Sequence, residues 1–285
     1  MSELSLSNEE KFRAHNRIYQ MLCRPNSTLK IILNRIKYHV KGTTTLTQAN
    51  LFCGEKIMVR LPETVSESLV FYHCLEIGLS KILLQYLRPS MIFVDIGAHI
   101  GYFTLLGSKL VSSTGIVYSF EPTPNTYKLL CKNVEGKQNI KTINAAAWST
   151  ETTLQFNDFG EKFSAFNSFT KPRLSNYKGT INKISVKAIP LDSYFIGILP
   201  DFVKIDAETS ELEVLKGMNR IISEKHPMIS IEVGDYLKDA PTTKECIDYL
   251  MDRNYTVLEY GEGKIKPHII REKYTYDNLF FIKQT

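Results

Sequence analysis

Five acidic residues follow apolar runs that are typical of buried strands. They are Asp95, Glu121, Asp206, Glu208 and Glu232. The carboxyl ends of parallel strands meet at one edge of a sheet, where open α/β folds bind their ligands, so we expect these carboxylates to converge on one cleft. Carboxylates in a cleft can hold the hydroxyls of a ribose, orient an acceptor, act as a general base or bind a metal ion.

A glycine turn follows the first of these runs. In VDIGAHIGYFT, residues 94–104, Gly97 would let the backbone pass close to a ligand, and Gly101 would let the following helix approach. The spacing G-x-x-x-G differs from the G-x-G-x-x-G that binds a pyrophosphate and from the G-x-x-x-x-G-K-[ST] of a phosphate loop. The turn therefore indicates a nucleoside ligand without a diphosphate.

Two further strand ends predict how a nucleoside would be held. Glu121, 24 residues after Gly97, can accept hydrogen bonds from both hydroxyls of a ribose, although an acid there would also suit NAD. The small residues of 144–147 leave room for a flat adenine, with Trp148 beside it. Ordinary strand packing explains those small residues equally well.

The segment KIDAETSELE, residues 204–213, again runs from a strand into a helix. Ser210 and Glu213 have the spacing of a capping box, which would fix the start of that helix. Asp206 and Glu208 would then face the cleft, and they are candidates for proton transfer or for orienting an acceptor.

The elements that must position these residues alternate between strand and helix beyond residue 55. This alternation favours a parallel sheet with helices on both faces. The last two strands, linked through Gly261 and Gly263 without a helical pattern, predict a hairpin and hence one antiparallel strand. The predicted strands are 91–96, 115–120, 140–147, 201–206, 227–233, 254–260 and 277–283, and the predicted helices are 66–87, 100–112, 124–134, 210–223 and 241–252.

One long segment, 156–184, has neither helical nor strand periodicity. Loops of this length inside a compact domain are usually functional or disordered. Its aromatic residues can line an apolar or sugar-stacking wall, or they can pack under a surface lid. Those residues are Phe163, Phe166, Phe169 and Tyr177.

The first 54 residues differ from the rest. Between Lys11 and Gly54 there is no acidic residue, although eight lysines and arginines lie there. Apolar spacing predicts two amphipathic helices, separated at Pro25. Their stripes are Phe12, His15, Tyr19 and Leu22, then Leu29, Ile32, Leu33, Ile36 and Val40, with Gly42 as the stop. The basic residues can attract anionic lipid, nucleic acid or an anionic substrate. The alternative, which we favour, is that the apolar stripes pack on the main domain and the basic residues face water.

Composition and length limit the classes of protein. The chain has 285 residues, 43% apolar and 23% charged, as in ordinary globular proteins. Its net charge of +5 is small for a dedicated nucleic-acid binder. Five cysteines without C-x-x-C spacing argue against a disulfide framework or a zinc ribbon. Without a stretch of signal-peptide character or membrane-spanning length, we expect a cytoplasmic protein.

These motifs resemble the FkbM family of S-adenosylmethionine (SAM)-dependent methyltransferases. The matching stretches are VDIGAHIGYFT at 94–104, SFEPTPNTYKLLCKN at 119–133, VKIDAETSELEVLKG at 203–217 and HPMISIEV at 226–233. The resemblance covers about residues 60–260 and implies the α/β, Rossmann-like class I methyltransferase fold. That fold is a seven-stranded, mostly parallel sheet with the last strand antiparallel. We expect a short basic helical extension at 1–54 and the methyltransferase domain at 55–285.

The resemblance also implies roles for individual residues. The methionine and sulfonium side of the SAM site would be shaped by Asp95, Gly97, Gly101 and Tyr102. The ribose would lie against Glu121 and the adjoining Pro122, and the adenine against Asn144 and Ala146. Asp206 would face the methyl group. His99 replaces the family's usual Asn and would still hydrogen-bond the cofactor. Thr209 and Ser210 replace a Gly-Ala pair, which would narrow the acceptor pocket.

We therefore expect in-line transfer of a methyl group from SAM to a hydroxyl of a small molecule or sugar, with S-adenosylhomocysteine as product. Asp206 is the first candidate base or orienting group, with Glu232 and Glu208 behind it; Mg2+ held by these acids would instead lower the hydroxyl pKa. An NAD-dependent oxidoreductase is disfavoured by the missing third glycine. The alternative is an inactive protein of this fold that binds nucleic acid or an anionic membrane through its N-terminus.

Overall fold

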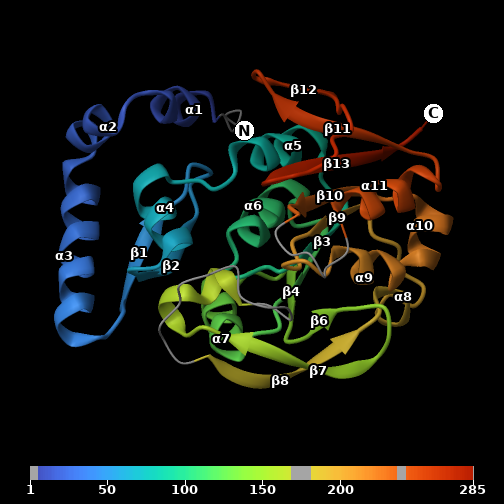
Figure 1. The fold of residues 1–285 in the computed structure, drawn as a ribbon, viewed down its shortest axis with the longest axis horizontal. Coiled ribbons are helices and arrows are strands. Elements are labelled where there is room, and N and C mark those ends of the chain that lie inside the picture. Colours follow the sequence, from blue (N-terminus) through green and yellow to red (C-terminus); the bar gives the residue numbers. More distant parts are fainter. Residues whose placement is uncertain (1–5, 168–180, 236–241, 285) are drawn as a thin grey trace.

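The computed structural model describes residues 6–167, 181–235 and 242–284. At its centre lies a sheet with the strand order β12-β11-β13-β10-β9-β3-β4-β5 (Figure 1). The strands are β3 (Ile92–Ile96), β4 (Ile116–Phe120), β5 (Ile140–Ile143), β9 (Phe202–Ile205), β10 (Met228–Val233), β11 (Tyr255–Gly261), β12 (Lys264–Pro267) and β13 (Asp277–Lys283). The five strands from β5 to β10 in this order are parallel, and β13 is antiparallel to both β10 and β11. A mostly parallel sheet with an antiparallel last strand is therefore confirmed.

The sheet has eight strands where the sequence predicts seven. The turn at Gly261–Gly263 folds β11 back onto the short strand β12 and does not lead to β13. The two central residues of that turn, Glu262 and Gly263, have φ values of 54° and 80°. Two positive φ values in a two-residue turn are typical of a tight type I′ hairpin. β13 returns from further along the chain and inserts between β10 and β11.

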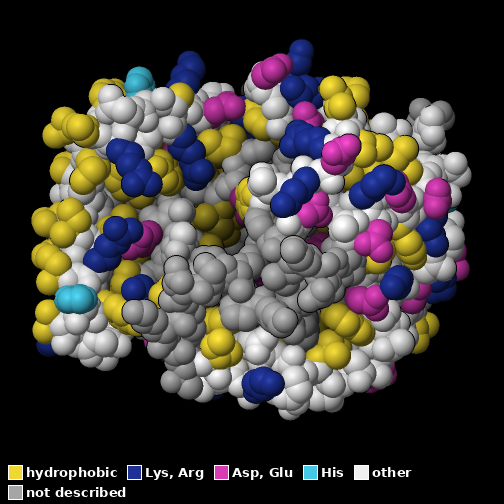
Figure 2. Space-filling view, viewed as in Figure 1, with side chains coloured by type: hydrophobic (Ala, Val, Ile, Leu, Met, Phe, Trp, Pro, Cys, Tyr) yellow, Lys and Arg dark blue, Asp and Glu magenta, His cyan; other side chains and the backbone are white. Residues whose placement is uncertain are grey.

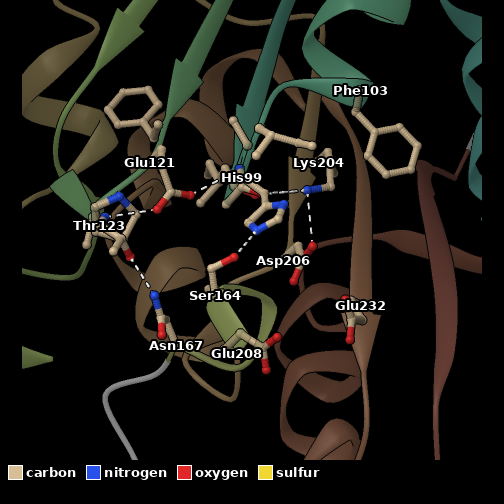
Figure 3. A pocket seen from close by; sticks show the side chains of 18 of the residues that line it. His99, Phe103, Glu121, Thr123, Ser164, Asn167, Lys204, Asp206, Glu208 and Glu232 are labelled. Carbon is tan, nitrogen blue, oxygen red and sulfur yellow. Dashed lines mark hydrogen bonds and ion pairs between the residues drawn. The ribbon is translucent and has the colours of Figure 1, made fainter. Parts of the chain in front are cut away.

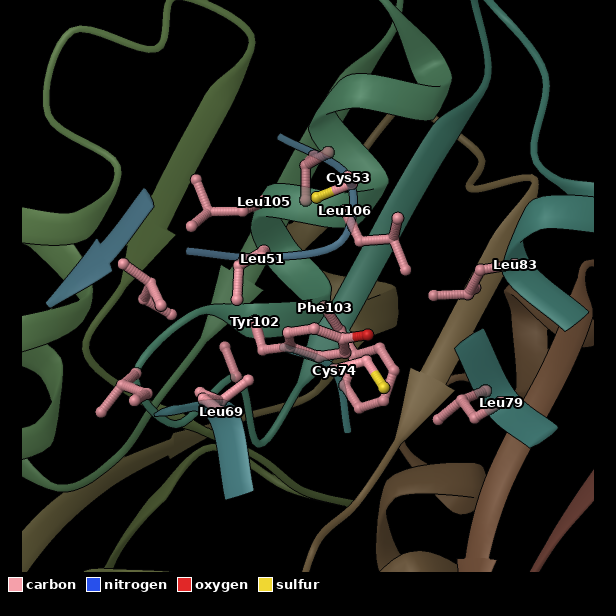
Figure 4. Packing of buried hydrophobic residues seen from close by; sticks show 14 of the residues in the cluster. Leu51, Cys53, Leu69, Cys74, Leu79, Leu83, Tyr102, Phe103, Leu105 and Leu106 are labelled. Carbon is pink, nitrogen blue, oxygen red and sulfur yellow. The ribbon is translucent and has the colours of Figure 1, made fainter. Parts of the chain in front are cut away.

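Helices cover both faces of the sheet and enclose two hydrophobic clusters. One face carries α5 (Ile77–Tyr86), α6 (Tyr102–Val111) and α7 (Pro124–Asn133), and the other carries α8 (Leu191–Tyr194), α9 (Glu211–Lys216), α10 (Asn219–Lys225) and α11 (Thr243–Met251). Consecutive residues of a strand point to opposite faces of the sheet. Phe93 therefore packs in the first cluster and Val94 in the second. Figure 4 shows side chains of α5 and α6 meeting in the first cluster.

Two predicted helices are each divided in the structure. The predicted helix 66–87 becomes α4 (Thr64–Tyr72) and α5, because the chain takes positive φ values at His73 and Glu76. The predicted helix 210–223 becomes α9 and α10, which are separated at Gly217. At Gly217 the backbone passes so close to the carbonyl oxygen of Trp148 that a Cβ atom would lie 1.9 Å from it.

A second, three-stranded sheet has the order β6-β8-β7. Its strands are β6 (Ala146–Ala147), β7 (Thr152–Asp158) and β8 (Asn182–Ile189). The predicted strand 140–147 therefore divides between β5 and β6, which belong to different sheets. The segment 156–184 begins in β7 and ends in β8, and these strands pair antiparallel up to Asp158 and Asn182. A 3-10 helix, η1 (Glu161–Phe166), follows β7.

The N-terminal region contains three helices, α1 (Ser7–Ala14), α2 (Arg17–Cys23) and α3 (Pro25–Lys41), where the sequence predicts two. The first predicted stripe is interrupted because His15 is extended, and the Asn16 side chain caps α2 by accepting from the Tyr19 N–H. Gly42 ends α3 with φ 67°, as predicted. Strands β1 (Thr45–Asn50) and β2 (Lys56–Leu61) then form an antiparallel pair.

The favoured arrangement of the N-terminal stripes is wrong for α2 and α3. The predicted stripe residues of α2 and α3 face water, and several basic residues of these helices contact the rest of the protein. Arg24 binds both carboxylate oxygens of Glu9, Arg35 pairs with Glu67, and Lys30 donates to the Gln48 carbonyl. The sequence pattern identifies the apolar face but carries no information on the direction in which that face turns. Among the described residues, no helix is both long enough and apolar enough to cross a membrane.

Candidate active site

The turn after β3 lies against the loop that follows β9. Gly97 has φ 68°, and its N–H and that of Ala98 both donate to the carbonyl of Phe120. A Cβ atom at Gly97 would lie 1.9 Å from the backbone oxygen of Asp206. A side chain at position 97 would therefore force these two loops apart, so the glycine is required for the approach of β3 to β9 as well as for its positive φ.

Glu121, at the end of β4, is 5% exposed and helps to line a cavity of about 270 Å³. Its Oε2 accepts from the N–H of His99 at 3.0 Å, and its Oε1 accepts from the N–H of Thr123 at 2.9 Å. Burial raises the pKa of Glu121, against the opposing effect of His99 and these donors. Each carboxylate oxygen has two acceptor positions, so Glu121 retains acceptor capacity for a ligand.

A buried lysine lies beneath the cavity. Lys204 in β9 is 2% exposed, and its Nζ lies 3.2 Å from Asp95 Oδ1 and 3.3 Å from Asp206 Oδ2. Nζ also donates to the backbone carbonyls of Ile96 and Gly97. Burial acts to lower the Lys204 pKa, but the surrounding carboxylates outweigh it and hold that pKa above its ordinary value. Lys204 thereby links the ends of β3 and β9 through hydrogen bonds and ion pairs.

Four further carboxyl groups line the cavity, and Figure 3 shows three of them, Asp206, Glu208 and Glu232. The fourth is Glu76, which precedes α5 and accepts from Asn278 Nδ2 at 2.8 Å. Burial, then repulsion from Asp206 and the other acids, raises the Glu232 pKa well above its ordinary value. Four of the five acids predicted to converge, Glu121, Asp206, Glu208 and Glu232, therefore line one cavity together with Glu76. The prediction is wrong for Asp95, which is fully buried and does not line the cavity.

The loop that carries Glu208 is strained and is fixed from within. Glu208 and Thr209 have φ values of 48° and 76°, which non-glycine residues rarely adopt. The Glu211 carboxylate folds back and accepts from the N–H groups of Ala207 and Thr209. The predicted capping box of Ser210 does not form, because its partner carboxylate binds Ser149 and Lys216 instead. Such strain is typical of functional sites.

Strand β7 contributes Phe156 to the lining of the cavity, and the segment after β7 contributes Ser164 and Asn167. His99 Nε2 lies 3.0 Å from Ser164 Oγ, while His99 Nδ1 is buried and has no hydrogen-bond partner among the described residues. Asn167 is 5% exposed and accepts from the Phe159 N–H at 2.9 Å. The long segment therefore does reach the cavity.

Of the four aromatic residues predicted to form a wall, Phe163 is the one whose side chain the structure describes. Phe163 lines a separate surface hollow beside Tyr38 and His39, not the cavity. The side chain of Phe166 and the residues Phe169 and Tyr177 lie outside the part of the chain that the structure describes.

Most of the predicted site residues line the cavity. They are Gly97, His99, Tyr102, Glu121, Pro122, Ala146, Asp206, Glu208 and Glu232. Asp95 lies behind the wall, where it is fully buried and accepts from Thr104 Oγ1 at 2.7 Å. Gly101 precedes α6 with φ 98° and faces Leu130. Asn144 donates to the backbone carbonyls of Glu121 and Pro122 and does not line the cavity.

Trp148 also lies outside the lining of the cavity, and its N–H donates to the Ile189 carbonyl. Tyr102 turns its hydroxyl into the core, 2.9 Å from Ser80 Oγ. Among the described residues, no group of three or more His, Cys, Asp or Glu is arranged to hold a metal ion.

Sequence reasoning missed Lys204, Glu76, Ser164 and Asn167. Lys204 carries a signal, since it is the charged residue in the otherwise apolar run Phe202–Ile205. Glu76 lies before a helix and Ser164 and Asn167 lie in an aperiodic segment, so their neighbours in sequence do not indicate the cavity.

The pKa of Glu76 predicts a pH-dependent stability. Burial, followed by the charge of Asp206, raises the Glu76 pKa from 4.5 to about 7, so the folded state keeps a proton that the unfolded chain releases. This stabilisation is complete below the unfolded pKa and is lost as the pH rises through about 7. Relative to Glu76→Gln, we expect the wild-type free energy of unfolding to fall by about 3 kcal/mol over that range.

Urea unfolding across that pH range measures the difference. Glu151→Gln is the matched control, because Glu151 is 67% exposed and removing its charge should leave the curve parallel to that of the wild type. Parallel curves for Glu76→Gln and wild type would show that Glu76 titrates alike in the folded and unfolded states.

Comparison with known proteins gives one family match and several distant structures. A family model described as "Methyltransferase FkbM domain" matches residues 95–257. No curated protein matches the chain. The crystal structure of Methyltransferase FkbM from Methylobacillus flagellatus is 18% identical with a TM-score of 0.43, and the match covers 76% of this chain and 54% of that one. The chain thus spans about half the length of that relative.

Two other solved structures are similarly distant. A putative rRNA methylase from Clostridium thermocellum is 11% identical with a TM-score of 0.46, covering 74% of this chain and 98% of that one. Aeropyrum pernix fibrillarin, solved with natively bound S-adenosyl-L-methionine, is 13% identical with a TM-score of 0.41, covering 69% and 68%.

Proposed function

Because the chain belongs to the FkbM family of SAM-dependent methyltransferases, we propose that it methylates a hydroxyl group on a small molecule or sugar. The observation that carries this proposal is the position of Asp206. Its carboxylate lines the cavity, its backbone touches the turn at Gly97, and Lys204 holds one of its oxygens. A carboxylate so placed can accept the proton that a hydroxyl must lose.

The residues present suit SAM. Glu121 retains acceptor positions for ribose hydroxyls, and the small side chains of 145–147 leave space beside it. The gathered carboxylates favour a ligand with a positive charge, and the chemistry that SAM supplies is a methyl group on a sulfonium. What remains for the protein is to align the acceptor and to exclude water.

The carboxyl groups divide into different roles. A buried acid whose pKa is raised keeps its proton and can donate a hydrogen bond. Glu232 has such a raised pKa, so it would donate to the acceptor oxygen while Asp206 receives the hydroxyl proton. Glu208, which lines the same cavity, would orient the acceptor.

Asp206→Asn tests this assignment. The variant keeps the shape of the side chain but cannot take a proton, so we expect kcat to fall by about 100-fold or more. Affinity for S-adenosylhomocysteine should change little, because the ribose contacts are at Glu121. Methyl transfer from labelled SAM and calorimetric titration measure the two quantities. A fall in kcat below about ten-fold would exclude Asp206 as an essential base.

A panel of acceptors tests the substrate class. Wild-type protein and labelled SAM would be incubated with sugars and hydroxylated small molecules in one arm and with amines of similar size in the other. Label on oxygen, identified by mass spectrometry, supports the proposal, and label on amines alone contradicts it. Addition of a chelator separates a carboxylate base from activation of the hydroxyl by Mg2+.

A further inference from the structure

An unusually apolar surface covers the outer side of α2 and α3. We call it the α2–α3 stripe, and its residues are Ile18, Leu22, Leu29, Leu33, Ile36 and Val40. Ile18, Leu22 and Val40 are 73%, 75% and 74% exposed, and the other three are more than half exposed. Figure 2 shows hydrophobic side chains along the edge of the molecule where Figure 1 places α3.

The residues of the stripe in α3 lie on one face of the helix. Leu29, Leu33, Ile36 and Val40 are separated by four, three and four residues, which is the repeat of a single helical face. The opposite face is occupied, since Ile31 packs against the main hydrophobic cluster. A helix with one face on the protein and a continuous apolar face in water indicates a binding surface for a second partner.

The orientation of α3 is fixed by polar contacts to its neighbours. Ser27 Oγ donates to the Val70 carbonyl at 3.0 Å, Lys30 Nζ to the Gln48 carbonyl at 3.1 Å and Lys37 Nζ to Thr45 Oγ1 at 2.9 Å. Arg35 pairs with Glu67. The stripe is therefore presented outward by the folded protein.

The charges beside the stripe select the partner. Residues 11–54 contain no acidic residue, and the exposed residues Arg17 and Lys41 adjoin Ile18 and Val40 of the stripe in the sequence. Two copies of the stripe placed face to face would bring these cations together without carboxylates from the same helices to pair with them. Nucleic acid would meet the cations but would leave the apolar residues in water. An apolar layer beneath an anionic surface satisfies both features, and that is the boundary of an anionic lipid bilayer.

We propose that the α2–α3 stripe docks this protein on the surface of an anionic membrane. The apolar side chains enter the boundary between headgroups and acyl chains, and the flanking lysines and arginines contact the lipid phosphates. This docking is independent of the proposed methyl transfer, since none of the stripe residues lines the cavity.

Flotation of the full chain with lipid vesicles tests the proposal. One set of vesicles contains phosphatidylcholine alone, and in the other about a third of the lipid is phosphatidylglycerol. We expect the wild type to bind the anionic vesicles at least about ten-fold more tightly and to lose that preference as the salt concentration rises. The double variant Leu33→Ser/Ile36→Ser should weaken binding by about ten-fold or more, because it removes two apolar side chains from the boundary.

The matched control is Ile196→Ser/Ile269→Ser. Both isoleucines are 81% exposed but lie elsewhere, so this variant should bind vesicles as the wild type does. Circular dichroism checks that both double variants remain folded. Failure of the wild type to bind anionic vesicles, or equal weakening by both variants, would overturn the proposal. So would sedimentation that shows a wild-type dimer which Leu33→Ser/Ile36→Ser converts to a monomer, because a second copy would then cover the stripe.

Discussion

Glu121→Ala should weaken the binding of S-adenosylhomocysteine by about 100-fold or more, as measured by calorimetric titration. Two hydrogen bonds from ribose hydroxyls to a buried carboxylate are charge-assisted, and each is worth about 1.5–3 kcal/mol. Glu121 is 5% exposed, so water cannot readily replace the lost acceptor.

The control for this result is Glu208→Gln, which changes another carboxylate of the same cavity and should leave the affinity within a few-fold. Glu121 also accepts from the N–H groups of His99 and Thr123, so urea unfolding must show that the variant remains folded at the temperature of the titration. Affinity within about three-fold of the wild type, in a folded variant, would mean that the ribose is held elsewhere.

Lys204→Met should lower the free energy of unfolding by about 3–5 kcal/mol, because it leaves one fully buried carboxylate, Asp95, and one partly buried carboxylate, Asp206, without their cation. Asp95 and Asp206 both lie within 3.3 Å of Lys204 Nζ. Without the ammonium they repel each other, and Asp95 is fully buried. Urea unfolding at neutral pH measures the loss.

Two comparisons sharpen this prediction. Lys216→Met breaks an exposed ion pair with Glu213, and such pairs contribute about 1 kcal/mol or less. Adding Asp95→Asn to the Lys204→Met protein removes one of the unpaired charges and should restore part of the lost stability. If Lys204→Met costs less than about 1 kcal/mol, Lys204 does not compensate the charges of Asp95 and Asp206.

Much of the scaffold follows from the sequence because its causes are local. The apolar run that ends at Ile96 must be buried on both faces, and the glycine at position 97 must begin a turn. Strand-end acids then share an edge wherever parallel strands are adjacent, which is why Glu121, Asp206 and Glu232 could be placed together before the fold was known.

The errors in the fold arise where two local signals compete. Ser210 and Glu213 have capping-box spacing, but the Glu213 carboxylate accepts from Ser149 and Lys216. The loop before the helix is held by the Glu211 carboxylate instead. The glycines at 261 and 263 indicate a tight turn correctly, yet a turn does not specify which later strand will pair with β11.

The missed site residues depend on tertiary structure. Glu76 is brought to the cavity by the break between α4 and α5, and its hydrogen bond to Asn278 spans most of the chain. Ser164 reaches His99 only because β7 pairs with β8 and turns the following segment toward the cavity. Neither contact has a signature in the residues that surround it in sequence.

The contacts of Gly97 and Lys204 hold the loops after β3 and β9 in a fixed position relative to each other. The backbone of Asp206 fills the space where a side chain at position 97 would stand, and Lys204 Nζ bonds to the end of β3 and to the Asp206 carboxylate at once. The position of the Asp206 carboxylate is therefore set by the protein and not by a bound ligand. If Asp206 is the base proposed above, acceptors would be selected by the distance between their hydroxyl and a carboxylate that cannot move to meet them.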